Sequence, residues 1–387
     1  MSLLDTASLI VTPNGYKEGK LYSVIPSDGS GDLSVTRATT ATRVNSAGLV
    51  ESMGNNVPRL DYSNGTCPSL LVEPQRTNYI NYSSSFDNAA WEKQLGASVT
   101  ANTTTAPDGT MSADTLTIAP NQYMYQLQGL SSGTSYTISF YCKVASGTKQ
   151  FNMVTYSPSG NINYSPTLTA TTEWQRFEFT ITANATASTS IYPVLVDSFA
   201  SGSFFIWGAQ VEVGSYATSY IPTTSASVTR NADVISKTGI SSLIGQTEGT
   251  LFVDVYRPTS NSPFIFMLAN STGANAYLNS LYLYQVDTSQ LTFDVFVSGA
   301  LQASIATSSS GLSVGRHKIA FAYKQNDFVL YVDGTQIGTD TSGNVPTLSA
   351  FEVNNVDIGS TSNFDINSVA LWKTKLDNAT LAQLTTI

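Results

Sequence analysis

Residues 328–337 read Phe328-Val-Leu-Tyr-Val-Asp-Gly-Thr-Gln-Ile337, and this stretch decides the fold class. Two short runs rich in apolar and β-branched residues flank Asp333-Gly334, a pair that tolerates the positive φ angles of a type I′ turn. The stretch therefore predicts a tight antiparallel β-hairpin.

The same two-residue period recurs along the rest of the chain. Between residues 135 and 143, Tyr136, Ile138, Phe140 and Cys142 fall on one face and polar residues fall on the other, which is typical of a half-buried strand. Further strands of this kind are predicted at 112–119, 122–128, 151–156, 177–181, 190–196, 203–212, 250–256, 263–268, 276–285, 291–297, 300–305, 317–323 and 335–338. One helix is predicted near the C-terminus, with Asp377 as its N-cap.

These patterns predict an all-β protein of two consecutive antiparallel β-sandwiches. The first sandwich is placed at residues 79–222 and the second at residues 223–387, because turn-forming residues separate strands at sandwich-like intervals in both. Residues 1–78 carry only weak strand signals and too little apolar material for an independent core. We therefore expect them to form a loop-rich attachment or oligomerisation segment.

Composition excludes several classes of function. Only 12% of the 387 residues are charged and the net charge is −9, so no basic field is available for nucleic acid or anionic membranes. We expect no membrane insertion, because no apolar run reaches the length of a span, and no secretion signal, because the N-terminus lacks a basic region. Cys67, Cys142 and His317 are too few for a zinc site, and we expect two free thiols.

The acidic and nucleophilic residues form no recognisable catalytic motif. The Glu-x-Asp cluster of glycosidases is absent, and His317 has no Gly-x-Ser-x-Gly partner. Asp254 and Asp294 lie in predicted strands, where we expect them to be solvated. We predict a protein that is not an enzyme, with no catalytic residue, no metal site and no cofactor. Carboxylates that are distant in sequence can still converge in a fold, so a hydrolase stays open as an alternative.

Tyrosine, with 20 copies, supplies the candidate binding residues. Sugars present apolar C–H faces and hydroxyl edges, so a glycan site combines flat aromatic rings with neighbouring polar side chains. Three clusters have this composition: Tyr123, Tyr125 and Gln126; Tyr156, Asn161, Asn163 and Tyr164; Tyr277, Asn279, Tyr282 and Tyr284. The alternative for each cluster is that its tyrosines merely cover a core while their hydroxyl groups stay in water.

Several motifs resemble known families. Pro58-Arg-Leu-Asp-Tyr62 and Cys67-Pro-Ser-Leu-Leu-Val-Glu-Pro-Gln-Arg-Thr-Asn78 resemble a module of tailed-bacteriophage head-fibre and tail-appendage proteins. The segment from Trp207 to Pro222, with Phe86-Asp-Asn-Ala-Ala-Trp91, resembles the carbohydrate-binding-module-like jelly roll that follows this phage motif. The C-terminal block, with Val369-Ala-Leu-Trp372, is similar to laminin-G and concanavalin A-like sandwiches.

The resemblance implies a non-enzymatic virion protein, made in the host cytoplasm and displayed on the virion surface. It implies a homotrimer whose N-terminal segment binds other capsid or tail proteins and whose sandwiches bind host or environmental glycans. It also allows a structural calcium ion, without assignable ligands. A capsid or tail decoration protein without ligand, a polysaccharide depolymerase and a secreted bacterial adhesin remain alternatives.

Overall fold

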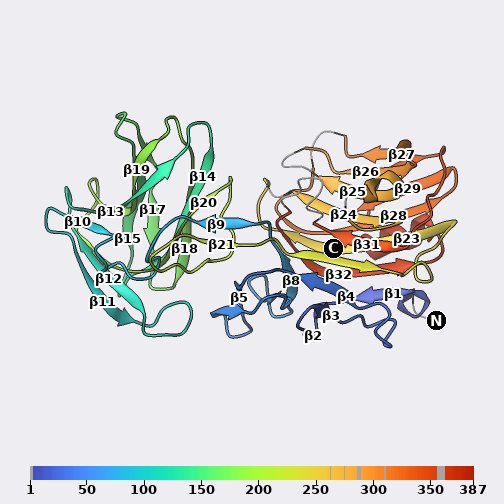
Figure 1. Ribbon diagram of the computed structural model, residues 1–387, viewed down its shortest axis with the longest axis horizontal. Coiled ribbons are helices and arrows are strands. Elements are labelled where there is room, and N and C mark those ends of the chain that lie inside the picture. Colours follow the sequence, from blue (N-terminus) through green and yellow to red (C-terminus); the bar gives the residue numbers. More distant parts are fainter. Residues whose placement is uncertain (1–2, 262, 274, 286–288, 309–310, 355–361) are drawn as a thin grey trace. The chain divides into compact units, whose positions relative to one another are not determined.

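The computed structural model describes the chain except residues 1–2, 262, 274, 286–288, 309–310 and 355–361. The described residues form two compact units. The split unit takes its residues from 1–48, 52–75 and 231–387, and the inserted unit comprises 49–51 and 76–230. Both are built from antiparallel β-sheets, so the predicted all-β sandwich class is confirmed (Figure 1).

The inserted unit is a sandwich of two sheets. The first, called the β13 sheet, has the order β10-β13-β19-β15-β16, and β17 also pairs with β15. The second, called the β14 sheet, has the order β11-β12-β20-β14-β18. Their strands are β10 (Glu92–Gln94), β11 (Ser98–Thr104), β12 (Ala113–Ile118), β13 (Tyr123–Leu130), β14 (Ser135–Lys143), β15 (Lys149–Tyr156), β16 (Ile162–Tyr164), β17 (Leu168–Ala170), β18 (Gln175–Thr182), β19 (Ala187–Leu195) and β20 (Gly202–Val213).

Aromatic residues join the two sheets of the inserted unit. Phe151 of the β13 sheet lies 5.9 Å from Phe140 and 5.7 Å from Phe204 of the β14 sheet, measured between ring centroids, and all three are fully buried. The predicted core face of β14 is thus confirmed. On its other face Thr137 and Ser139 are buried as well, and Thr137 donates a hydrogen bond to the Gly214 carbonyl.

The split unit is also a sandwich of two sheets. The β25 sheet has the order β2-β3-β4-β22-β31-β24-β25-β26-β27, and the β23 sheet has the order β30-β29-β28-β23-β32-β8-β7 with β1 also on β32. Their strands are β1 (Leu9–Val11), β2 (Tyr16–Lys17), β3 (Lys20–Leu21), β4 (Leu33–Thr36), β7 (Leu60–Asp61), β8 (Ser69–Val72), β22 (Val234–Thr238), β23 (Glu248–Arg257), β24 (Phe264–Ala269), β25 (Ser280–Gln285), β26 (Thr292–Val297), β27 (Ala300–Ala306), β28 (Gly315–Lys324), β29 (Asp327–Val332), β30 (Thr335–Asp340), β31 (Ala350–Val353) and β32 (Phe364–Trp372).

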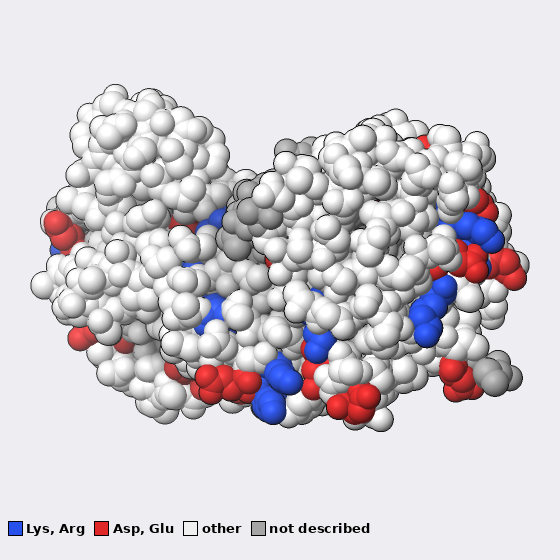
Figure 2. All heavy atoms as spheres, turned by 45° about the vertical axis from the view of Figure 1, so that its right-hand side comes forward, with Lys and Arg blue, Asp and Glu red and all other residues white. Residues whose placement is uncertain are grey.

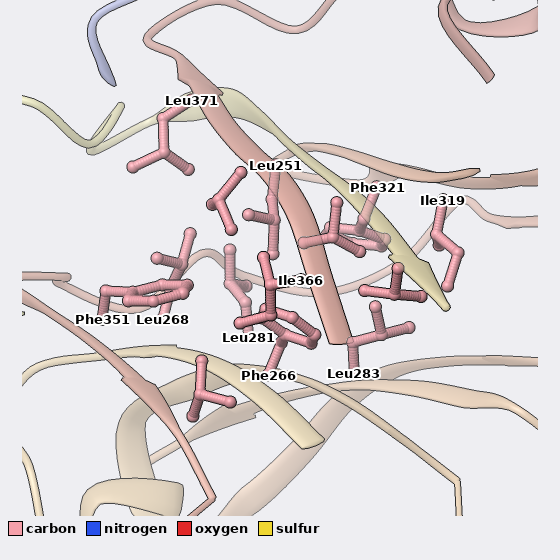
Figure 3. Packing of buried hydrophobic residues seen from close by; sticks show 14 of the residues in the cluster. Leu251, Phe266, Leu268, Leu281, Leu283, Ile319, Phe321, Phe351, Ile366 and Leu371 are labelled. Carbon is pink, nitrogen blue, oxygen red and sulfur yellow. The ribbon is translucent and has the colours of Figure 1, made fainter. Parts of the chain in front are cut away.

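Apolar side chains from both sheets fill the core of the split unit. Figure 3 shows Leu251 and Ile366 of the β23 sheet projecting into the same space as Phe266 and Leu281 of the β25 sheet. The remaining elements of the chain are η1 (Leu3–Thr6), β5 (Ala41–Val44), β6 (Val50–Met53), β9 (Arg76–Asn78), β21 (Val228–Arg230), η2 (Ala276–Asn279) and α1 (Asn378–Thr385). No helix among the described residues is long and apolar enough to cross a membrane.

Two local predictions are confirmed in the split unit. Asp333 and Gly334 have φ angles of 49° and 79° and connect β29 to β30, as a type I′ turn requires. Asp377 caps α1, since its carboxylate accepts a hydrogen bond from the Thr380 N–H at 2.8 Å. Both features depend only on residues close together in the sequence.

The predicted division into three consecutive parts differs from the structure. Residues 3–75 are not a separate segment, because Leu9 of β1 pairs with Leu371 and Leu70 of β8 pairs with Ile366. On the other sheet, Val35 of β4 pairs with Ile235. The N-terminal residues therefore complete both sheets of the C-terminal sandwich, and the other sandwich is inserted into it rather than preceding it. Their few apolar residues contribute to this shared core instead of forming their own.

We predict that residues 76–230 fold when expressed alone, whereas residues 231–387 alone do not. Residues 76–230 contain the main core of the inserted unit and leave out only Val50 of a smaller cluster, but residues 231–387 lack the strands that pair with Leu371 and Ile366. Thermal unfolding followed by circular dichroism should show a cooperative transition for the first fragment and none for the second. A cooperative transition for residues 231–387 would contradict this assignment.

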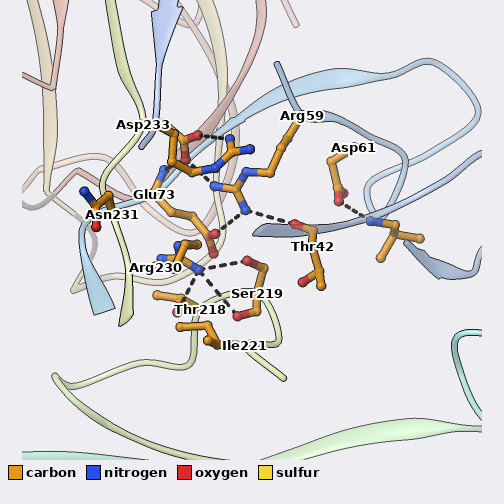
Figure 4. A network of polar contacts seen from close by, with 12 residues as sticks. Thr42, Arg59, Asp61, Glu73, Thr218, Ser219, Ile221, Arg230, Asn231 and Asp233 are labelled. Carbon is orange, nitrogen blue, oxygen red and sulfur yellow. Dashed lines mark hydrogen bonds and ion pairs between the residues drawn. The ribbon is translucent and has the colours of Figure 1, made fainter. Parts of the chain in front are cut away.

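A buried ion-pair network holds the split unit together where the chain leaves it and returns. Arg59 donates to Glu73 at 2.6 Å and to Asp233 (Figure 4), and Arg37 donates to Asp233 at 2.8 Å. The Asp233 N–H also donates to the Glu73 carbonyl. Burial lowers the pKa of Arg59, but the carboxylates of Asp233 and Glu73 more than offset this effect and the pKa is raised.

We predict that Arg59→Met lowers the free energy of unfolding by about 3–5 kcal/mol, because it leaves two buried carboxylates without their shared cation. Lys324→Gln is the matched control, since it breaks an exposed pair with Glu248 that is worth about 0–1 kcal/mol. Urea unfolding of both variants provides the measurement. Equal losses for the two would show that the buried network adds no more than a surface pair.

Candidate functional site

Five tyrosines share the outer face of the β13 sheet, and we call this group the tyrosine face: Tyr123 and Tyr125 of β13, Tyr192 of β19, Tyr156 of β15, and Tyr164 of β16. Val154 pairs with both Tyr192 and Tyr164, so these side chains project from the same side of the sheet. Met124 and Met153 alternate with them and point into the core. The face therefore follows from strand alternation across four strands.

Three rings of the tyrosine face contact one another. The centroid of the Tyr125 ring lies 6.1 Å from that of Tyr123 and 5.4 Å from that of Tyr192, and Tyr123 and Tyr192 are 5.9 Å apart. Tyr156 and Tyr164 are exposed, and the side chains of Leu127 and Ile162 are exposed as well. The surface thus offers flat aromatic rings and apolar area to solvent, which is suited to stacking against a ligand.

Glu92 supplies a carboxylate at the edge of the tyrosine face. The Tyr125 hydroxyl donates to Glu92 Oε2 at 2.7 Å, and this hydrogen bond is the main reason that the pKa of Tyr125 rises to about 12. The hydroxyl therefore keeps its proton to a higher pH than an ordinary tyrosine does, and the hydrogen bond holds the ring against β10. A fixed ring loses little side-chain entropy when a ligand stacks on it.

The structure separates the polar members of the first two predicted clusters from their tyrosines. Gln126 is buried on the opposite face of β13 and is hydrogen-bonded to the backbone of Asn81 through both its oxygen and its nitrogen. Asn163 alternates with Tyr164 and donates to Thr155. Asn161 lies in the turn before β16 and donates to Ser159. Tyr123, Tyr125, Tyr156 and Tyr164 come together on one face, whereas the three amides do not join them.

Sequence reasoning missed Tyr192, the ring between the two tyrosine clusters. Its strand was predicted, but the register that sets Tyr192 beside Tyr125 depends on pairing between β13 and β19. Leu127, Ile162 and Glu92 were missed for the same reason. One sequence signal could have indicated the face. An apolar residue stands two positions from a tyrosine in two places, as Leu127 does from Tyr125 and Ile162 does from Tyr164.

The third predicted cluster is a more covered surface on the β25 sheet. The rings of Tyr282 and Tyr284 stack 4.5 Å apart, but Tyr282 packs against Met267 and Ala276. Burial raises the pKa of Tyr282. Tyr277 and Asn279 lie on η2 rather than on the predicted strand, and the Asn279 side chain accepts a hydrogen bond from the Ser298 N–H.

The expectation that Asp254 and Asp294 are solvated is wrong. Asp294 is buried and accepts hydrogen bonds from Tyr284 at 3.0 Å and Ser304 at 2.6 Å. Asp254 is buried beneath Arg316, which donates to it through Nε and Nη2 at 2.8 and 2.5 Å. Alternation places both outward, as predicted, but neighbouring strands supply polar side chains that hydrogen-bond to them.

Asp365 is a further buried acid of the split unit, on β32. Burial, together with the negative charges of Asp61 and Glu73, raises its pKa well above the ordinary value of 3.8. The Asn64 amide donates to its Oδ2 at 2.6 Å, and no described residue bonds its Oδ1. Asp365 therefore holds a proton in the folded state at pH values where the unfolded chain has lost it.

We predict that Asp365→Asn stabilises the protein at neutral pH. Above pH 3.8 the folded wild type binds more protons than its unfolded chain, because the pKa of Asp365 is raised only in the folded state. The free energy of unfolding of the wild type therefore falls as the pH rises from 3.8 through the raised pKa. The variant has no carboxyl group at this position and does not show this loss. The melting temperature of the variant should exceed that of the wild type at pH 7, with a gap that narrows toward pH 3.8. A gap that widens in acid would contradict the assignment.

A match to a known protein family lies within the inserted unit. Residues 78–195 match the model of a family described as "Carbohydrate binding domain". The matched range contains all five residues of the tyrosine face. Among curated proteins, nothing matches this chain.

Two carbohydrate-binding modules are among the solved structures to which part of this chain is similar. The CBM40 module of the Ruminococcus gnavus IT-sialidase, bound to α2,3-sialyllactose, is 13% identical over 37% of this chain and 84% of that chain, with a TM-score of 0.31. The CBM22-1 xylan-binding domain of Paenibacillus barcinonensis Xyn10C is 13% identical over 36% of this chain and 94% of that chain, with a TM-score of 0.30.

Proposed function

We propose that the protein binds glycans through the tyrosine face of the inserted unit. The observation that carries the proposal is that five tyrosines from four strands share one outer face inside the range that matches a carbohydrate-binding family. Sugar rings stack on such aromatic surfaces through their C–H faces, while tyrosine hydroxyls and Glu92 accept or donate hydrogen bonds at the edge.

The weakly charged surface supports a ligand recognised by uncharged contacts. On the face of the molecule that Figure 2 shows, Lys, Arg, Asp and Glu are scattered among uncharged residues. Single sugar sites of this kind are weak, and several copies on one assembly would raise the apparent affinity through avidity.

We further propose that the protein is displayed on a bacteriophage virion as a head-fibre or tail-appendage component. The motif at residues 58–78 supports this through its resemblance to such proteins. The N-terminal residues would contact other capsid or tail proteins, and the assembly would be a homotrimer. Immunogold labelling of intact particles tests the location, and light scattering on the purified protein tests the trimer; unlabelled particles or a monomeric mass would contradict the respective part.

Binding of the full-length protein to a glycan array and to immobilised host polysaccharide tests the sugar function. We predict that Tyr125→Ala weakens binding at least about tenfold, because it removes the ring that contacts both Tyr123 and Tyr192, and tenfold corresponds to about 1.4 kcal/mol. Tyr22→Ala, at an exposed tyrosine of the split unit that belongs to none of the three predicted clusters, is the matched control and should bind like the wild type.

The same samples separate the alternatives. Saturable binding that depends on Tyr125 without released sugar fragments supports the proposal. Fragments detected by chromatography would show a depolymerase instead. No saturable binding to any glycan would favour a decoration protein without ligand.

A further inference from the structure

The outer face of the β23 sheet in the split unit is covered over one half and open over the other. Phe252 of β23 packs under α1 and the N-terminal residues, in a cluster with Ala7 and Leu381. Asp254 and Tyr256 follow at two-residue spacing on the same face, and there the sheet forms the floor of a cavity of about 720 Å³. We call this cavity the β23 cleft.

Two loops wall the β23 cleft. Residues 12–14, which follow β1, line one part of it, and residues 64–68, which lie between β7 and β8, line another. The second loop is tied to the floor, because Asn64 donates to the buried Asp365. The volume lies within the range of about 300–1,000 Å³ that is usual for small-molecule sites.

An oriented arginine lies in the β23 cleft. Arg316 donates to the Asp254 carboxylate through its Nε and Nη2 atoms. Asn367 also donates to Asp254, at 3.0 Å. This arrangement uses the side-on pair of guanidinium donors. No described residue accepts a hydrogen bond from Nη1 of Arg316, and half of the Arg316 side chain is exposed to solvent. The end-on donors therefore remain for a ligand with two adjacent oxygen atoms.

The other groups that line the β23 cleft are uncharged. Tyr256 contributes an aromatic ring, and Ser368, Thr12 and Thr66 contribute hydroxyl groups. Asp254 already neutralises the charge of Arg316, so the cleft carries no uncompensated positive charge for an anion. A ring beside bidentate donors, hydroxyls and amides matches the apolar face and vicinal hydroxyls of a neutral sugar.

We propose that the β23 cleft is a second carbohydrate site, which binds a neutral saccharide through Arg316, Asn367 and Tyr256. It is independent of the tyrosine face, because all of its residues belong to the split unit. The chain would then contact two sugar units, and a polysaccharide bound at both would dissociate more slowly than from either.

Cys67 provides a direct reporter of occupancy. It is exposed and lines the β23 cleft, whereas Cys142 is buried in the inserted unit. The experiment measures the rate at which iodoacetamide alkylates Cys67 in the full-length protein, by mass spectrometry of its peptide. The probes are the neutral disaccharides lactose, maltose and cellobiose and the acidic sugars glucuronate and N-acetylneuraminate.

At least one neutral disaccharide should slow alkylation of Cys67, by about tenfold when its concentration is about nine times its dissociation constant. Arg316→Lys keeps a cation beside Asp254 but loses the end-on pair of donors, and it should require about tenfold more sugar for the same protection. The matched control is Lys324→Arg, at the other end of β28, which should behave as the wild type. Tyr125→Ala should leave the protection unchanged while it weakens binding at the tyrosine face.

Three outcomes would overturn the proposal. The first is that no neutral disaccharide slows alkylation, including the case in which only the acidic sugars do so. The second is that Arg316→Lys is protected as well as the wild type. The third is that Tyr125→Ala abolishes protection, which would assign the effect to the tyrosine face. Alkylation of Cys142 in any variant would reveal unfolding, and protection would then be measured on Asn367→Ala instead.

Discussion

The structure depends on one constraint. The chain leaves the split unit for 155 residues, from 76 to 230, and then returns, so the split unit must be assembled from segments on both sides of this insertion. The departing and returning segments are joined on the side of the split unit by Arg59, Glu73 and Asp233, all of them buried. Within the inserted unit they are joined again, because β9 pairs with β21 over Arg76–Asn78 and Val228–Arg230. Burying three charges costs desolvation energy that only mutual pairing offsets, so the network is stable only when both segments are in place.

This arrangement explains why the N-terminal residues have so little core of their own. Leu9, Val35 and Leu70 are buried to 1% exposure or less, but each pairs with a residue beyond 230. The split unit can therefore finish folding only after the whole chain is available, whereas nearly all of the inserted unit lies in the single stretch 76–230, which contains its main core. Pairing between such distant segments carries a larger loop-closure cost, which a folded insertion reduces by bringing its own ends together.

The two units use the outer faces of their sheets differently. In the split unit, α1 and the N-terminal residues cover part of one sheet, and the exposed remainder has an arginine that is oriented by a buried carboxylate. In the inserted unit, the β13 sheet leaves a row of tyrosines uncovered, with Tyr125 fixed by Glu92. Both surfaces present aromatic and uncharged polar groups on a rigid sheet, which suits recognition of hydroxylated ligands.

The sequence alone determined the strand periodicity, the Asp333-Gly334 hairpin and the Asp377 helix cap, because each depends on neighbours within a few residues. It also indicated four of the five tyrosines that share the outer face. Only the tertiary structure decided that Leu9 pairs with Leu371, that Tyr192 completes the face, and that Gln126 and Asp254 are buried. Alternation assigns a residue to one of two faces of a strand. Which strand lies beside it, and what covers the face, depends on pairing between distant segments, for which local sequence carries no signal.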